Sequence, residues 1–185
     1  MSAYDLPTSM EVNGAVYPIR SDYRAILDII GVLGDPDITD EARTIVALTI
    51  FYEDFDAMPV DDFQEAIERL FWFMNGGAES KKSGSKPRLM DWEQDFPLIV
   101  SPVNKVLGYE IRACDYLHWW SFLAAYQEIG DCMFAQVVSI RKKRMQGKKL
   151  DKADSQFYQE NRELVDLHTH ETDAEKALLD KWTQR

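Results

Sequence analysis

The sequence is poor in the residues that most often bind metals or form disulfides. Its 185 residues include two cysteines, Cys114 and Cys132, and three histidines. The two cysteines stand 18 positions apart in the sequence, and neither has a second cysteine close by. This spacing does not fit a structural zinc site, which usually takes its ligands in close pairs, and it does not indicate a disulfide framework. A reducing compartment is therefore favoured.

Cys114 and His118 deserve separate consideration, because they stand four residues apart and can meet across one helical turn. A zinc site or a Cys-His nucleophile would need further ligands, an orienting group and an oxyanion pocket, none of which the sequence indicates. We expect a buried thiol, a histidine at a helix start, and solvated side chains at His168 and His170. No catalytic residue, metal site or cofactor is predicted.

Long apolar runs and an excess of positive charge are also missing. The longest apolar runs, such as 98–100, fall far short of the roughly 20 residues that cross a bilayer. With 32 acidic and 21 basic side chains, the net charge is −11, which argues against a polyanion as the main partner. We therefore expect a protein that does not span membranes and that resides in the cytoplasm.

The charge is distributed unevenly along the chain. Residues 1–80 carry 16 acidic and 4 basic side chains, whereas residues 81–150 carry 7 acidic and 12 basic ones. Acidic pairs such as Asp61-Asp62 stand where helices or turns are expected, so we interpret them as caps and solvated faces rather than as cation sites. The chain is thus acidic in its first part and basic in its middle.

The first part predicts a small hairpin and three helices. Asn13-Gly14 between two short β-prone segments is a strong signal for a two-residue turn. Ser21 or Asp22 can cap a helix to Gly34, Thr39 can cap a second to Tyr52, and a third is expected over 61–75.

The second part predicts further helices after a polar linker. Residues 78–90 have no apolar periodicity and are expected to form a flexible internal loop. Helices are expected from Asp95, kinked or restarted at Ser101-Pro102, and from Asp151 through Leu164. The predicted fold class is mainly α: a single domain over 1–185 with a bundle of about six helices. Its parts are an acidic segment (1–77), the linker (78–90), an aromatic and basic segment (91–167) and a charged tail (168–185).

The stretch from Asp115 to Lys149 is the most distinctive part of the chain. On a helix starting after Asp115, one face would carry a set of large apolar side chains: Tyr116, Trp119, Trp120, Leu123 and Tyr126. A second helix would end in a run of cations, which suits the negative end of the helix dipole. We expect a helical hairpin with a basic end. The candidate partner-binding residues are Trp119, Trp120, Arg141, Lys142, Lys143, Arg144, Lys148 and Lys149.

Three roles are open for the basic run. A protein contact ranks first, either with the acidic part of the same chain or with that part of a second copy. A solvated helix end ranks second, and nucleic acid ranks third, because the overall acidity opposes it and Gly147-Lys148-Lys149 lacks the pattern of a phosphate-binding loop.

The order of several motifs resembles one family over most of the chain. These motifs are Leu117-His118-Trp119-Trp120-Ser121-Phe122, Ile140-Arg141-x-Lys143, Gly147-Lys148-Lys149-Leu150, Tyr158-x-x-Asn161, Asp95-x-x-x-Ile99, Gly108-Tyr109-Glu110-Ile111 and Asp22-Tyr23-Arg24-x-Ile26-Leu27. They resemble the phage gene-product-fifteen family, encoded between the major tail protein and the tape measure protein in long-tailed phages and prophages of Gram-positive bacteria.

The resemblance implies a tail assembly chaperone rather than an enzyme. Such a protein would bind the tape measure protein and recruit the major tail protein. It could also form a homo-oligomer, and it would be absent from the mature virion. Two alternatives belong to different classes. One is a structural tail-completion or head-tail connector protein that stays in the particle. The other is a regulator that binds nucleic acid through residues 141–149.

Overall fold

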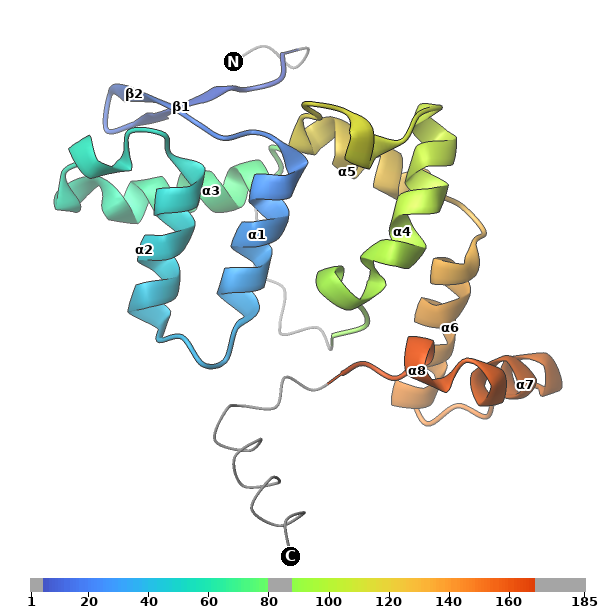
Figure 1. Ribbon diagram of the computed structural model, residues 1–185. Coiled ribbons are helices and arrows are strands. Elements are labelled where there is room, and N and C mark those ends of the chain that lie inside the picture. Colours follow the sequence, from blue (N-terminus) through green and yellow to red (C-terminus); the bar gives the residue numbers. More distant parts are fainter. Residues whose placement is uncertain (1–4, 80–87, 169–185) are drawn as a thin grey trace, which may run out of the picture. The chain divides into compact units, whose positions relative to one another are not determined.

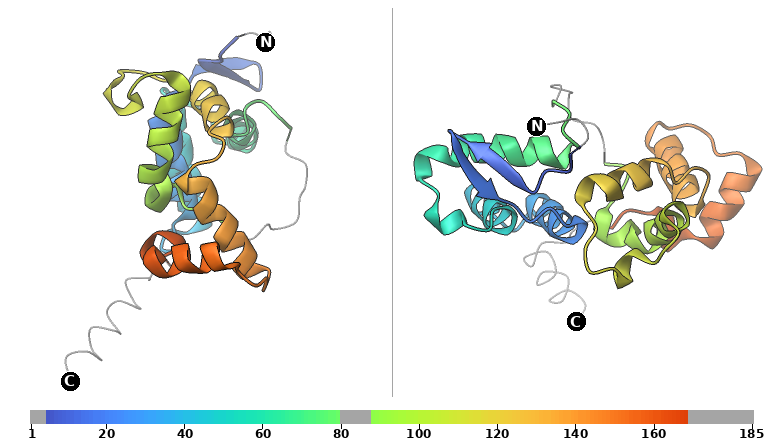
Figure 2. Two further views of the ribbon diagram at one scale, coloured as in Figure 1. Left: turned by 90° about the vertical axis from the view of Figure 1, so that its right-hand side faces the viewer. Right: turned by 90° about the horizontal axis from the view of Figure 1, so that it is seen from above.

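The computed structural model describes residues 5–79 and 88–168 (Figures 1 and 2). The described residues divide after Gly77 into two compact units, each of which is described by itself. Both units are built mainly from helices, and the one sheet in the described residues is a two-stranded hairpin. The predicted fold class is confirmed. Most of the predicted linker and nearly all of the predicted tail lie outside the described residues, and the single domain stays a prediction.

The first unit begins with the predicted hairpin. Strands β1 (Ser9–Val12) and β2 (Ala15–Pro18) pair in antiparallel register, with Val12 opposite Ala15. The turn residues Asn13 and Gly14 have φ of 47° and 81°, the left-handed region that an Asn-Gly turn requires.

Three helices follow, each close to its predicted bounds: α1 (Tyr23–Gly34), α2 (Asp40–Phe51) and α3 (Phe63–Met74). Asp22 accepts the N–H of Arg24, and Thr39 accepts the N–H of Ala42, so both predicted caps are confirmed. Two short 3-10 turns precede α3: η1 (Phe55–Ala57) and η2 (Val60–Asp62). In Figure 1, α1 and α2 run side by side, and α3 crosses behind them.

The core of the first unit is built from β1, α1, α2 and α3. Its fully buried side chains include Val12, Ile26, Ile29, Leu48, Phe51, Tyr52, Leu70 and Phe73. The Tyr52 hydroxyl donates to the Ala66 carbonyl of α3 at 3.0 Å, which satisfies the polar end of this buried ring. The hairpin is tied to α3 separately, because the backbone N–H of Asn13 donates to Glu65 at 2.9 Å.

The described residues of the second unit form five α-helices and one 3-10 turn. These are α4 (Trp92–Leu107), η3 (Ile111–Ala113), α5 (Trp119–Gln127), α6 (Met133–Met145), α7 (Lys152–Glu160) and α8 (Arg162–Val165). Helices α5 and α6 both pack against α4, and α8 packs against α6. An aromatic cluster connects α4 to α5: Trp92, Trp119, Phe122 and Tyr126. The two helices of the predicted hairpin, α5 and α6, thus both pack against a third helix, α4.

Helix α4 begins earlier than predicted. Its cap is Asp91, whose carboxylate accepts the N–H of Gln94 at 2.7 Å, so that Asp95 lies inside the helix and is fully buried. Pro97 and Pro102 both lie within the one continuous helix, and the predicted restart at Ser101-Pro102 does not occur. Gly108 ends the helix with φ of 80°, as expected.

Helix α5 begins three residues later than predicted and buries a different face. His118 is its N-cap and accepts the N–H of Trp120 at 3.0 Å, so the expected helix-start histidine is confirmed. Tyr116 therefore precedes the helix and is 53% exposed. The buried side chains of α5 are Trp119, Phe122 and Ala125, whereas the predicted members Trp120, Leu123 and Tyr126 are half-buried.

The predicted helix from Asp151 is divided in two at Asn161, where φ is −129°. Asp151 caps α7 as predicted, accepting the N–H of Asp154 at 2.8 Å. The break turns the short helix α8 back onto α6. There Val165 joins Val137 and Ile140 in a buried cluster that Leu98, Leu150, Phe157 and Tyr158 surround.

Candidate functional site

The candidate site is the C-terminal end of α6, where the predicted cations lie. Phe134, Val137, Ile140 and Arg141 are the buried residues of this helix. Arg141 follows Phe134 by seven residues and Val137 by four, a spacing that places it on the apolar face. The first cation of the run is therefore part of the interior of the second unit.

Arg141 forms a buried bidentate ion pair with Asp95. Its two terminal nitrogens Nη1 and Nη2 lie 2.6 and 2.9 Å from the carboxylate oxygens Oδ2 and Oδ1. The side chains of Arg141 and Asp95 are 5% and 0% exposed. Parallel N–H···O bonds of this kind are strong and specific in geometry.

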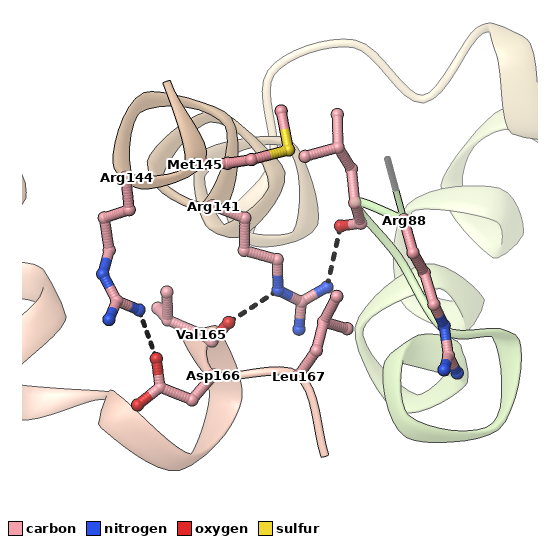
Figure 3. A pocket seen from close by; sticks show the side chains of 8 residues that line it. Arg88, Arg141, Arg144, Met145, Val165, Asp166 and Leu167 are labelled. Carbon is pink, nitrogen blue, oxygen red and sulfur yellow. Dashed lines mark hydrogen bonds and ion pairs between the residues drawn. The ribbon is translucent and has the colours of Figure 1, made fainter. Parts of the chain in front are cut away.

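The remaining donors of Arg141 reach backbone carbonyls on two other segments. Nε donates to Val165 at 2.7 Å, as Figure 3 shows. Nη2 donates to Leu164 at 2.7 Å, and Nη1 to Leu89 at 3.2 Å. All five N–H groups of the guanidinium thus have acceptors. Arg141 thereby joins α6 to α4, to α8 and to the segment before α4.

Arg144 lies one turn further along α6 and is also paired within the unit. It forms an ion pair with Asp166, and its guanidinium lies 4.1 Å from the ring centroid of Tyr158. The Tyr158 hydroxyl donates to the same carboxylate at 3.1 Å. The three side chains hold the end of α8 and the start of the following segment against α6.

Lys143 faces α7 rather than solvent alone. Its ammonium forms an ion pair with Asp154 and lies 3.8 Å from Asp151, the cap of that helix. The hydrogen bond to Asp154 raises the pKa of Lys143 above its ordinary value. Three of the four cations in the run are therefore neutralised by acids of the same unit.

The remaining predicted residues divide into exposed lysines and packed indoles. Lys142, Lys148 and Lys149 are exposed and form no ion pair within the part of the chain that the structure describes. Trp119 is buried at 2% exposure, and Trp120 is half-buried. The structure does not gather the eight predicted residues on one surface. Of the eight, the three lysines are exposed and unpaired in the described residues, whereas Trp119 and Arg141 are buried in the second unit.

A surface hollow of about 380 Å³ lies beside these pairs. Figure 3 shows Arg141 and Arg144 extending from α6 toward the segment that contains Val165 and Asp166. The lining residues are Arg88, Leu89, Arg141, Arg144, Met145, Val165, Asp166 and Leu167. Each arginine of the lining has a carboxylate partner, since Arg88 pairs with Asp91. The positive charge of these three arginines is therefore already compensated within the unit.

Sequence reasoning missed the acids that complete this site. Asp95 was expected to open a helix, and Asp154 and Asp166 were not singled out. One signal was present in the sequence. The spacing of Phe134, Val137 and Arg141 places a cation on the apolar face of a helix, and a buried cation needs an acidic partner. The identity of that acid depends on tertiary structure.

Neither a metal site nor a membrane span emerges from the described residues. Among residues 5–79 and 88–168, no three His, Cys, Asp or Glu side chains are grouped so that they could hold a metal ion. No helix in that part of the chain has the length and apolar character needed to cross a membrane.

Comparison with known proteins identifies one family. The family described as "Bacteriophage Gp15 protein" matches residues 3–167, which is most of the chain. Comparison with curated proteins and with solved structures gave no match. The matched range includes nearly all described residues of both compact units and the whole Arg141 network. The chain therefore belongs to the bacteriophage Gp15 family.

Proposed function

We propose that this protein is a tail assembly chaperone of a long-tailed phage or prophage. It binds the tape measure protein and recruits major tail protein subunits while the tail is built. It acts in the cytoplasm of the bacterial host, contributes binding rather than catalysis, and leaves before the virion is complete. The observation that carries the proposal is membership of the bacteriophage family over residues 3–167.

The surface chemistry of the chain supports a binding role. A chaperone for a long apolar client has to keep the complex soluble while offering apolar contact. The first 80 residues carry 16 acidic and 4 basic side chains, and several large apolar side chains are exposed in the same region, including Val16, Ile45, Val46, Val60 and Phe71. Charge and apolar contact are thus combined on one unit.

The second unit supplies a different surface. It carries exposed lysines at and after the end of α6, and it also has the hollow that Met145 and Leu167 help to line. Electrostatic attraction between an acidic and a basic surface favours ordered association of several copies along one client. We accordingly expect the protein to act as an oligomer when it is bound to the tape measure protein.

The composition of purified particles tests whether the protein acts as a chaperone. Quantitative mass spectrometry is applied to virions and to the lysate from which they were purified. A chaperone is expected in the lysate and absent from the virions, whereas the major tail protein is present in both. A fixed copy number in every virion contradicts the proposal and supports a tail-completion or connector protein.

A further inference from the structure

The outer face of α2 carries an apolar stripe that nothing in the described residues covers. Ile45 and Val46 are 41% and 38% exposed. Ala42 and Thr49, also exposed, extend the stripe at the i, i+3, i+4, i+7 spacing of one helix face. The opposite face of α2 carries Ala47, Leu48 and Phe51, which are fully buried in the core. Helix α2 is thus apolar on both sides.

The polar group within the stripe is turned inward. The Thr49 hydroxyl donates to the Ile45 carbonyl of its own helix at 2.8 Å. This bond satisfies the hydroxyl and leaves the methyl group available to a neighbour. The other large exposed apolar residues of the first unit, namely Leu6, Val16, Val60 and Phe71, come singly from different elements. Helix α2 is therefore where exposed apolar side chains form a regular face.

Acidic side chains stand at both ends of this stripe. Asp40 and Glu41 occupy the first turn of α2, and Glu53 and Asp54 follow its last turn, all of them exposed. The one base of the helix, Arg43, pairs with Asp40 at 3.1 Å. At the other end of α2, the guanidinium of Arg20 donates to the carbonyls of Thr49, Ile50 and Tyr52. Within the described residues, Glu41 at the first end and Glu53 and Asp54 at the second end therefore stay without an ion pair. Since α2 has 12 residues, the acidic ends lie about 18 Å apart. A ligand for this face has to offer apolar groups in its middle and positive charge at its two ends.

We propose that the outer face of α2 is a docking site for an amphipathic helix of another protein, whose apolar stripe is flanked by lysine or arginine. A helix laid on a helix presents side chains at the same spacing of three and four residues. A second copy of this unit is the wrong occupant, because pairing two α2 faces would bring the unpaired acids at their ends together without a compensating base. The docking site follows from the surface of α2 and does not depend on the role in tail assembly.

Two designed helical peptides with the same apolar stripe provide the test. One carries lysines at both ends, about 12 residues apart, and the other carries glutamates at those positions. Binding to the full-length protein is measured by fluorescence anisotropy at low and high salt. We expect the lysine peptide to bind at least about tenfold more tightly than the glutamate peptide, with a preference that falls as salt rises.

Matched variants locate the contact on α2. Ile45→Gln with Val46→Gln removes the apolar contact without changing charge, and glutamine is at least as good a helix former as the residues it replaces. This double variant is expected to lose at least about tenfold in affinity for the lysine peptide. Glu41→Gln with Glu53→Gln is expected to reduce the salt dependence. Val60→Gln, at an isolated residue that is 75% exposed, is the control and should bind as the wild type does.

Three results would overturn the docking site. The first is equal binding of the lysine peptide to the Ile45/Val46 variant and to the Val60 control. The second is equal binding of the two peptides to the wild type. The third is a wild-type dimer, seen by light scattering, that the Ile45/Val46 variant dissociates, which would assign the stripe to self-association. None of these results bears on whether the protein binds the tape measure protein through another surface.

Discussion

The guanidinium of Arg141 and the carboxylate of Asp95 face each other across the interior of the second unit at 2.6 and 2.9 Å. Both side chains are almost fully buried, and they stand 46 positions apart in the sequence. A buried pair of this kind becomes costly when one partner is removed, because the other charge stays behind without compensation.

Arg141→Met is accordingly expected to lower the free energy of unfolding by about 3–5 kcal/mol. The substitution also leaves the carbonyls of Leu89, Leu164 and Val165 without their donor. Urea denaturation followed by circular dichroism measures the loss. Lys142→Met, at the next position of the same helix but exposed, is the control and should change stability by no more than about 0.5 kcal/mol.

A double variant shows whether Arg141 and Asp95 stabilise the unit as a coupled ion pair. Asp95→Leu combined with Arg141→Met removes both charges, so it is expected to be less destabilised than the sum of the two single variants. Additive losses would contradict a coupled pair. Comparable losses for Arg141→Met and Lys142→Met would show that Arg141 does not maintain the interior.

The cluster of Arg144, Tyr158 and Asp166 predicts a local effect rather than a global one. These side chains are partly exposed, so Arg144→Met is expected to cost no more than about 1 kcal/mol. Its main result should be faster hydrogen exchange at the amides of Val165 and Asp166, which bond to carbonyls at the start of α8.

Hydrogen exchange read by mass spectrometry or NMR checks this prediction. Tyr158→Phe keeps the ring beneath the guanidinium and loses the bond to Asp166, so a smaller increase is expected. Lys148→Met, at an exposed lysine four residues after Arg144, is the control. Unchanged exchange at both amides in the Arg144 variant would refute the idea that this cluster holds α8 against α6.

The contact between the hairpin and α3 predicts that the stability of the first unit falls at acidic pH. The backbone N–H of Asn13 and the guanidinium of Arg69 both bond to Glu65, and they lower the pKa of Glu65 below its ordinary value. A lowered pKa in the folded state stabilises the protein fully above the ordinary value of 4.5, and this contribution is lost as the pH falls through the folded value.

Glu65→Gln should therefore be less stable than the wild type at neutral pH. Its free energy of unfolding should also fall less than that of the wild type as the pH drops below the ordinary pKa of a glutamate. Thermal or urea unfolding over a series of acidic pH values measures both effects. Glu68→Gln, on the same helix but without a contact to the hairpin, is the control. Parallel pH profiles for the wild type and the Glu65 variant would contradict the prediction.

The burial of Tyr52 predicts that the stability of the first unit also falls at alkaline pH. Its ring is fully buried, and burial raises the pKa of its hydroxyl above the ordinary value of 10.0. A raised pKa means that the folded state holds the proton more tightly. The resulting stabilisation is complete below the ordinary pKa and is lost as the pH rises above it.

Spectrophotometric titration should show Tyr52 ionising only as the first unit unfolds. Tyr52→Phe should remove this component and cost about 1 kcal/mol through the lost bond to Ala66. Tyr109→Phe, at a residue that is 45% exposed, is the control and should leave the late component in place. Ionisation of Tyr52 without unfolding would contradict its burial.

Local signals in the sequence predicted much of the fold. The caps Asp22, Thr39 and Asp151 and the Asn13-Gly14 turn were all found, because each depends on residues within three positions of itself. The start of α5 was misplaced by three residues. An apolar periodicity that begins at Tyr116 conceals the capping role of His118, since histidine is not among the usual N-cap residues.

The candidate site was less predictable, because its ion pairs join residues that are far apart in the sequence. The run 141–144 looks like one basic patch in the sequence, yet Arg141 lies on the buried face of α6, and Lys143 and Arg144 face acids on α7 and beyond α8. The pairing of Arg144 with Asp166 depends on the break at Asn161, which directs α8 back onto α6, and the pairing of Arg141 with Asp95 depends on the packing of α6 against α4. Charge counts along the sequence cannot provide that pairing.

The most direct test of the central claim is co-expression of this chain with the tape measure protein of its own genome. Solubility of the tape measure protein is measured with and without this chain, and the soluble material is analysed by size-exclusion chromatography with light scattering. The chaperone account predicts a soluble complex that contains several copies of this protein for each tape measure protein. An insoluble tape measure protein, with this chain eluting alone, would contradict that account.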